Sequence, residues 1–202
     1  MYKIYLASKS PRRKELMNQI GYDFEVLISE RDEVISDTKP EEVVKELSMQ
    51  KAYEIERILL ERAQGKLLEA HKDYDGVIII GADTVVAYED AILGKPADEE
   101  DAYRMLKMIQ GKTHMVSTGV AIVVIDSKGR KVYNFADSTD VHMYEMSDEE
   151  IREYVATSEG VDKAGSYAIQ GIGAKFIKGI DGDYNNVVGL PIGRIYQTLK
   201  SL

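Results

Sequence analysis

The sequence predicts an α/β protein built on a mixed β-sheet with helices on its faces. In its first half, short apolar runs typical of strands alternate with longer amphipathic runs typical of helices. Later, two long strand-like runs follow one another across a turn at 127–129, which predicts a hairpin. With 202 residues, the chain suits one domain or two small lobes that share a cleft.

The elements of the first half follow from apolar spacing and from residues that begin or end helices. Ser10 and Pro11 are typical of a helix start, and Gly21 favours the positive φ in which many helices end. The predicted elements are a strand of about five residues around Ile4, a helix from Pro11 to Gly21, a helix from Pro40, a helix tail and loop over 62–75, a strand over 76–86, and a helix over 98–111.

The second half is predicted to hold a long hairpin and a glycine-rich segment. Residues 160–193 contain eight of the 16 glycines, so this stretch should be rich in loops. Asp181 and Gly182 predict a tight hairpin turn. The remaining predicted elements are strands over 115–126 and 131–144, a short helix capped by Ser147, and a last helix from Pro191 with Ile192, Ile195, Tyr196 and Leu199 facing inward.

Charge and composition exclude several classes of function. The 26 basic and 35 acidic residues give a net charge of −9, which disfavours nucleic-acid binding because that requires a broad basic face. The chain has no cysteine, which excludes disulfides, thiolate metal sites and cysteine nucleophiles. No apolar run is long enough to span a membrane, and the first residues lack the pattern of a signal peptide. These features predict a cytoplasmic protein.

The first candidate site is the junction between the first strand and the first helix. Residues 1–14 hold five basic residues and no acidic one, although the chain is acidic overall. The N–H groups of a helix N-terminus, the hydroxyls of Ser8 and Ser10, and the guanidinium groups of Arg12 and Arg13 together favour a bound phosphate. The glycine spacing of a P-loop is absent. The alternative is an ordinary capped helix with solvated arginines.

Two charged residues interrupt apolar patterns. Lys51 lies on the apolar stripe of the second helix, so its ammonium group either reaches out to solvent or enters a cleft. Asp83 interrupts the apolar run over 77–86, where an unpaired buried carboxylate would cost several kcal/mol. It is therefore either a functional carboxylate or a residue that a turn at Gly81 exposes.

The other polar candidates give weaker signals. Glu33 offers a second carboxylate, although residues 30–33 also fit a solvated loop. The segment 162–171 contains glycines that allow close approach of the backbone, and the amide of Gln170 matches the donor and acceptor groups of a base edge. The three histidines are far apart without ligand spacing, so they are expected to be structural or on the surface: His71, His114 and His142.

Four segments of the chain match the motifs of one known family in that family's order. They are LASKSPRR at 6–13, GADTVV at 81–86, GKP at 94–96 and QGKTH at 110–114. Together they resemble the Maf family of nucleoside triphosphate pyrophosphatases, over about residues 3 to 200. The segments DKAGSY at 162–167 and IQG at 169–171 look like the branch of that family that acts on dTTP and UTP.

The resemblance implies a fold similar to that of inosine triphosphate pyrophosphatases. That fold is an elongated mixed sheet flanked by helices, here a single domain over 1–202 with two lobes around a nucleotide cleft. The implied activity is hydrolysis of dTTP, UTP or modified pyrimidine triphosphates to the monophosphate and pyrophosphate, as a house-cleaning enzyme. The family's general base maps onto Asp83. Its other cleft and selectivity residues map onto Ser8, Arg12, Arg13, Glu33, Lys51, Thr84, Lys95 and Gln170.

The resemblance also implies a divalent metal, Mg²⁺ or Mn²⁺, with Glu33 and Asp83 as candidate carboxylate ligands. Whether Asp83 is the base or a metal ligand stays open at this point. The expected partner is the nucleoside triphosphate, with a homodimer allowed and neither nucleic acid nor membrane expected. Because the family is tied to arrest of cell division, the alternative function is a regulatory binding protein that does not rely on catalysis.

Overall fold

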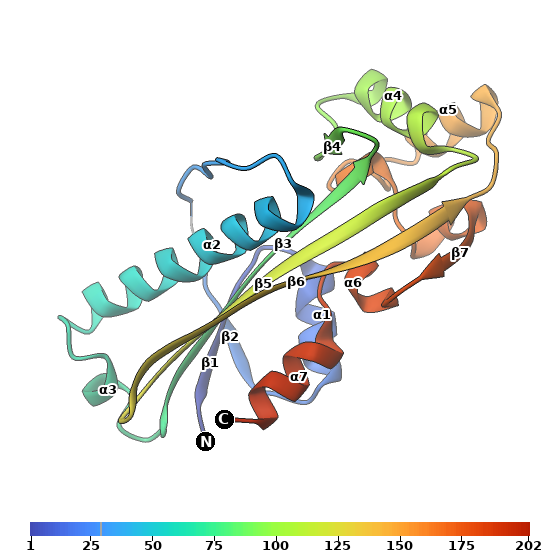
Figure 1. Ribbon diagram of the computed structural model, residues 1–202. Helices are drawn as coiled ribbons and strands as arrows, with labels where there is room; N and C mark the ends of the chain where they lie inside the picture. Colours follow the sequence, from blue (N-terminus) through green and yellow to red (C-terminus); the bar gives the residue numbers. More distant parts are fainter. Residues whose placement is uncertain (29) are drawn as a thin grey trace. The chain divides into compact units, whose positions relative to one another are not determined.

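The computed structural model describes residues 1–28 and 30–202, and it has the mixed α/β architecture that the sequence predicts (Figure 1). Seven strands form one sheet in the order β2-β1-β3-β5-β6-β7, with β4 paired to β3. The strands are β1 (Lys3–Ala7), β2 (Phe24–Val26), β3 (Gly76–Tyr88), β4 (Ala91–Leu93), β5 (Thr113–Asp126), β6 (Gly129–Met143) and β7 (Ile177–Asp181).

The helices begin where the sequence places capping residues. The side chains of Ser10, Asp98 and Ser147 each accept a hydrogen bond from a backbone N–H in the first turn of the helix that follows. The α-helices are α1 (Pro11–Gln19), α2 (Pro40–Arg62), α3 (Leu67–Ala70), α4 (Glu99–Ile109), α5 (Asp148–Ala156), α6 (Tyr184–Val188) and α7 (Ile192–Lys200), and the 3₁₀ helices are η1 (Ala164–Ser166) and η2 (Gly171–Phe176). No helix among the described residues is long and apolar enough to cross a membrane.

The pairing of the strands makes the sheet mixed, as predicted. β1 is parallel to both β2 and β3, and Ala7 at the end of β1 lies opposite Gly81. β4 is antiparallel to β3, and β7 is antiparallel to β6. The carboxyl end of β1 therefore lies beside the middle of β3, which is the part of the sheet that carries the first candidate site.

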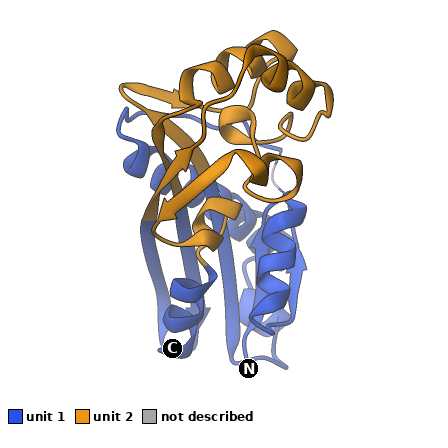
Figure 2. Ribbon diagram, turned by 90° about the vertical axis from the view of Figure 1, so that its right-hand side faces the viewer, with its two compact units in different colours: residues 1–83, 119–136, 192–202 blue, residues 84–118, 137–191 orange. Residues whose placement is uncertain are grey.

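The chain divides into two compact units, drawn in different colours in Figure 2. The first comprises residues 1–83, 119–136 and 192–202. Residues that alternate along β1 and β3 face α2 and are buried with its inner side chains. That core contains Tyr5, Ala7, Ala52, Ile55, Leu59, Leu67, Val77, Ile79, Ala121 and Val123. The intervening strand residues are buried as well, so both faces of these strands are covered, as their continuous apolar runs predict: Ile4, Leu6, Ile78 and Ile80.

The second unit comprises residues 84–118 and 137–191. Its core is formed by side chains of α4 and α5 together with strand residues and the aromatic rings of the glycine-rich segment. The predicted helix over 98–111 is present as α4, and Ala102, Met105, Leu106 and Ile109 form its buried face. The buried cluster contains Val86, Leu93, Met105, Leu106, Ile109, Val116, Val141, Met143, Met146, Ile151, Tyr154, Tyr167 and Phe176.

Three local predictions are wrong. Asp181 and Gly182 do not form a hairpin turn, because β7 ends at Asp181 and the next aspartate, Asp183, caps α6 by accepting the N–H of Asn185. Tyr196 is 38% exposed although it shares its helix with buried neighbours, so the inward face of α7 is narrower than predicted. The stretch 62–75 contains the short helix α3 in addition to the predicted loop.

Candidate active site

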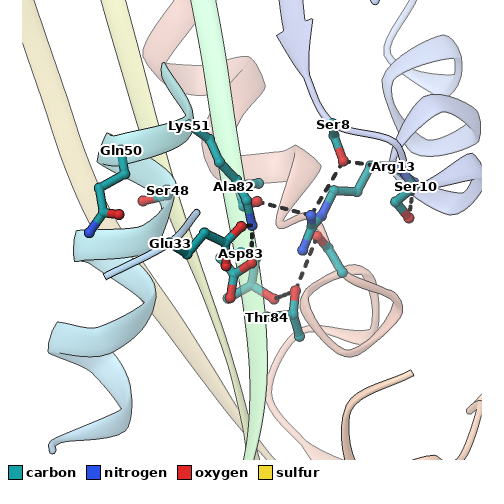
Figure 3. Close-up of polar contacts among 12 residues, drawn as sticks. Ser8, Ser10, Arg13, Glu33, Ser48, Gln50, Lys51, Ala82, Asp83 and Thr84 are labelled. Atoms are coloured by element: carbon teal, nitrogen blue, oxygen red, sulfur yellow. Dashed lines mark hydrogen bonds and ion pairs between the residues drawn. The ribbon is translucent and has the colours of Figure 1, made fainter. Parts of the chain in front are cut away.

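The candidate residues of the first unit gather where β1 ends beside β3 (Figure 3). Because Ala7 lies opposite Gly81, the next residue of each strand brings Ser8 close to Ala82. The chain then turns into α1, whose N-cap is Ser10. In an open sheet of this kind, ligands bind outside the carboxyl ends of the parallel strands.

Close packing of α2 on β3 brings Lys51 to Asp83. A Cβ atom at Gly81 would lie 2.2 Å from the carbonyl oxygen of Ser48, so the two backbones are in contact there. Asp83 lies two residues further along β3 and therefore on the same face of the strand as Gly81. Lys51 lies three residues after Ser48, one turn further along α2. The glycine contact thus places a lysine of the helix opposite an aspartate of the strand.

Lys51 lies between two carboxylates (Figure 3). Its ammonium group forms an ion pair with Asp83 Oδ1 and a second one with Glu33 Oε1 at 3.0 Å. The Lys51 and Asp83 side chains are 20% and 16% exposed, whereas Glu33 is 44% exposed. Of the two alternatives for Lys51, the structure shows entry into a polar site. Asp83 is therefore largely buried but paired, which removes most of the cost of burying its charge.

Arg13 approaches the same site from α1. Its Nη1 donates to the carbonyl oxygen of Ala82 at 2.9 Å and to Ser8 Oγ at 3.3 Å. Burial lowers the pKa of the Arg13 guanidinium, and the negative charge of Asp83 opposes that effect. Ser8 Oγ also accepts the N–H of Ser10 at 3.2 Å, so both acceptor positions of this hydroxyl are used.

The other two residues of this basic segment have different surroundings. Ser10 Oγ accepts the N–H of Arg13 at 3.5 Å, so in this structure its side chain acts as the cap of α1. Pro11 has no N–H, and two of the N–H groups expected to face an anion already bond to serine hydroxyls. The side chain of Arg12 is half-buried on α1. Arg13, on the same helix, is close enough to Asp83 for the carboxylate to act on its pKa.

A glutamine that the sequence analysis missed holds the loop that carries Glu33. The carboxamide of Gln50 accepts the N–H of Val34 at 3.0 Å and donates to the carbonyl oxygen of the same residue at 2.5 Å. One turn earlier on α2, Glu46 accepts both the N–H and the hydroxyl of Ser36, and these bonds lower its pKa. Because that loop has no periodicity, the only sequence signal was the position of Gln50 next to Lys51.

The two carboxylates of the site have the donor atoms that a divalent metal requires. Asp83 and Glu33 offer the hard oxygen atoms that Mg²⁺ and Mn²⁺ take, and both pair with the ammonium group of Lys51. Among the residues that the structure describes, no group of three His, Cys, Asp or Glu side chains would hold a metal by itself. The pair therefore fits an ion that takes its other ligands from phosphate oxygens and water, as Mg²⁺ commonly does.

Three further candidates belong to the second unit. Thr84 Oγ1 lies 2.9 Å from Thr118 Oγ1 and 3.5 Å from the carbonyl oxygen of Gly189. Lys95 is exposed two residues after β4, and Gln170 is exposed immediately before η2. The hydroxyl of Thr84 is thus held within its unit, while the Lys95 and Gln170 side chains face outward.

The histidines have structural contacts, as expected. His71 Nε2 lies 2.8 Å from the hydroxyl of Tyr5, and His114 Nε2 lies 2.8 Å from that of Tyr167. His142 lies between Thr113 and an exposed aspartate of β7. His114 is buried, and burial together with the nearby His142 lowers its pKa to about 4.

Comparison with known proteins covers nearly the whole chain. The profile of a family described as "Maf-like protein" matches residues 3–202. A protein of Agathobacter rectalis named "dTTP/UTP pyrophosphatase" is 53% identical over 100% of this chain and 98% of its own length. Two proteins with the same name are each 46% identical to this chain. The match to the protein of Thermoanaerobacter sp. strain X514 covers 98% of this chain and 95% of the relative. The match to the protein of Bacillus thuringiensis subsp. konkukian covers 99% of this chain and 95% of the relative.

One solved structure aligns over a similar range. It is described as a nucleoside-triphosphatase / dITP/XTP pyrophosphatase from Mycobacterium abscessus, and it covers 98% of this chain and 95% of its own. The two sequences are 13% identical and the TM-score is 0.42. The family match therefore rests on the sequence comparisons and not on this alignment.

Proposed function

This chain belongs to the Maf-like protein family, and from that membership we propose that it hydrolyses dTTP, UTP and related modified pyrimidine triphosphates to the monophosphate and pyrophosphate. One observation carries the proposal: Arg13 and Lys51 lie beside the carboxylates of Asp83 and Glu33 at the end of β1. Such a site can bind an anionic chain and act on a water molecule. No observation on the described residues favours a regulatory role without catalysis, so no second function is proposed.

The cations of the first unit would bind the triphosphate. A polyphosphate carries three to four negative charges at neutral pH, and guanidinium and ammonium groups pair with phosphate oxygens through charge-assisted hydrogen bonds. Arg13 is fixed by its bonds to Ala82 and Ser8, so its charge is in place before the ligand arrives. Ser8 has both acceptor positions filled, so its own proton is the group that would reach a phosphate.

Asp83 would act on the attacking water. The water oxygen forms a bond to the α-phosphorus, the bond from that phosphorus to the bridging oxygen breaks, and pyrophosphate leaves. Asp83 would orient the water and accept its proton. Asp83 is paired with Lys51, so an anionic ligand that draws Lys51 away would leave this carboxylate free to bind the water.

A magnesium or manganese ion held by Asp83 and Glu33 would supply neutralisation of the charge on the phosphate oxygens. Gln50 would then matter because it holds the loop that carries Glu33. This role is proposed for the residues of the chain and rests on the chemistry of the two carboxylates.

The remaining candidates are proposed as substrate residues from the motifs that they occupy. Lys95 would add a further cation for the phosphates, and Gln170 would pair with the base. Uracil and thymine present an acceptor, a donor and an acceptor along one edge, and a planar carboxamide carries one of each. Arg12 and Thr84 would shape substrate choice. Cytosine reverses two of these positions, so a site built for uracil would reject it.

The test is pyrophosphate release from a panel of dTTP, UTP, CTP and GTP, each with Mg²⁺ and with Mn²⁺. We expect kcat/KM for dTTP and UTP to exceed that for CTP and GTP by at least about 10-fold. A preference for CTP or GTP would contradict the proposed reading of the base. No release of pyrophosphate from any of the four would contradict the proposed activity itself.

The proposal places the enzyme among cytoplasmic nucleotides, with the nucleoside triphosphate as its partner. A homodimer and the exclusion of nucleic acid and membranes stay predictions. The two compact units are proposed to serve one activity, since the family match spans both of them.

A further inference from the structure

Glu159 is enclosed by the segment that carries Gln170. One carboxylate oxygen accepts the N–H of Ile172 at 2.9 Å, and the other accepts the N–H of Gly173 at 2.9 Å. The second oxygen also accepts the hydroxyl of Tyr154 at 2.8 Å. The Glu159 carboxylate thus accepts three hydrogen bonds, two of them from backbone that lies two and three residues beyond Gln170.

Tyr154 holds the other side of the same segment. Its hydroxyl accepts the N–H of Ala168 at 3.1 Å, two residues before Gln170, while donating to Glu159. The ring is 2% exposed and packs edge-on against Phe176 in the core of the unit. The backbone on both sides of Gln170 is therefore bonded to Tyr154 and Glu159, and Tyr154 is anchored in the core.

The glycines of the segment fit against these two side chains. Gly171 has a φ of +70°, and a Cβ atom there would lie 2.1 Å from Glu159 Oε1. At Gly173 a Cβ atom would lie 2.3 Å from the carbonyl oxygen of Ala168 and 2.9 Å from the Tyr154 hydroxyl. The backbone of the segment can wrap Glu159 because these positions carry no side chain.

The negative charge of Glu159 strengthens the hydrogen bonds that it accepts from the backbone N–H groups of Ile172 and Gly173. Burial acts to raise its pKa, but the hydrogen bonds from Ile172, Gly173 and Tyr154 and the charge of Lys163 together lower it. Glu159 is therefore an ionised acceptor at neutral pH. The buried bond between His114 and Tyr167 fixes the residue that precedes Ala168.

We propose that Glu159 and Tyr154 are positioning residues for base selection: they fix the backbone around Gln170 so that its carboxamide meets the base in one orientation. The proposal rests on the proposed function, and it assigns to two residues a role that they exert through the backbone around Gln170. Gln170 itself is exposed, so the backbone that these residues hold sets the position from which its side chain reaches the base.

The test compares Glu159→Gln with the parent. A carboxamide keeps the shape but replaces one acceptor by a donor, so at least one of the three bonded donors loses its partner. We expect the ratio of kcat/KM for dTTP to that for CTP to fall about 10-fold, with kcat/KM for CTP changed less than about twofold. In a Gln170→Ala background the same substitution should change the ratio no further.

The matched control is Glu150→Gln. Glu150 is also a carboxylate that accepts a backbone N–H, that of Ser147 at 2.8 Å, but this bond belongs to the cap of α5. This variant should keep the parental ratio while losing similar stability. Where Glu159→Gln fails to fold, Tyr154→Phe removes only the hydroxyl and should give the same loss of selectivity.

A second measurement separates this inference from the proposed function. Amide hydrogen exchange over residues 168–173 should accelerate about 10-fold in Glu159→Gln and stay parental in Glu150→Gln, whether or not the protein hydrolyses dTTP. Unchanged exchange would overturn the anchoring. The positioning role would be overturned if exchange became faster while the dTTP-to-CTP ratio of kcat/KM stayed unchanged. It would also be overturned if the effect of Glu159→Gln on that ratio were additive in the Gln170→Ala background. Either result would leave the proposed function intact.

Discussion

Replacing Asp83 by asparagine separates its proposed catalytic role from a role in binding. The substitution keeps the shape of the side chain and removes its charge. Asp83 is paired with Lys51 and is 16% exposed. It is the one aspartate of β3, so no other aspartate of that strand could replace it as the base. We expect kcat to fall at least ~100-fold, which corresponds to about 2.7 kcal/mol of transition-state stabilisation.

The structure also fixes the expected effects on binding and stability. Removing a negative charge beside Arg13 and Lys51 leaves these cations more attractive to a polyphosphate, so KM should stay level or fall while kcat falls. Lys51 keeps its ion pair with Glu33 at 3.0 Å, so the free energy of unfolding should drop by only roughly 1–2 kcal/mol. The variant should therefore be folded at 25 °C.

Steady-state pyrophosphate release from dTTP, together with urea unfolding, measures these three quantities. Asp140→Asn is the control, since Asp140 is an exposed aspartate of β6, and it should match the parent in all of them. A kcat within about threefold of the parent would refute the assignment of the base. So would a raised KM at unchanged kcat, because that pattern belongs to a binding residue.

The remaining predictions concern Arg13, Gln50, Gly81 and His114. Arg13→Ala should lower kcat/KM about 10-fold or more for every substrate alike, and an effect confined to one base would contradict a phosphate contact. Gln50→Ala should lower kcat/KM several-fold but cost under about 1.5 kcal/mol of stability in urea, because the two bonds that it removes are exposed. Gly81→Ala should lower both kcat and the free energy of unfolding, because the added Cβ would lie 2.2 Å from the Ser48 carbonyl oxygen. The loss of stability should be at least about 2 kcal/mol. Parental values of both quantities would show that α2 can shift to accept the Cβ without harm. The pKa of His114 is lowered from 6.5 to about 4, so the unfolded chain binds more protons than the folded one between these pH values. The contribution of His114 to stability should be complete above pH 6.5 and should fall by roughly 3 kcal/mol as the pH drops to 4. In urea unfolding curves measured at each pH, His114→Gln should flatten this slope.

The long elements could be predicted from the sequence because each has a local signal. The apolar stripe of α2 and the caps of α1, α4 and α5 depend on residues within one element. The three-residue strands β2 and β4 have no such signal, since three residues do not establish a period. At Asp181 and Gly182 the local signal was misleading, because Asp183 was available to cap a helix.

The sequence predicted those residues of the candidate site whose charge interrupts an apolar pattern. Lys51 and Asp83 stood out because a charge interrupts an apolar stripe or run, and the structure brings them into contact. Gln50 and Glu159 could not be found in that way, because each is a polar residue in a polar context. Their role depends on which backbone groups they contact, and that depends on the tertiary fold.

The ion pairs of Lys51 change what a charge count says about the affinity for an anion. In the protein without ligand, this lysine already serves as the counter-ion of Asp83 and Glu33, and the three groups together carry one net negative charge. A phosphate that binds there takes Lys51 from carboxylates with which it is already paired. The gain in binding free energy is therefore the difference between two sets of ion pairs. Binding should therefore depend on ionic strength less steeply than the number of cations in the cluster suggests. The same exchange uncovers both carboxylates as the anion arrives, so the site acquires its capacity to attract a cation together with its substrate.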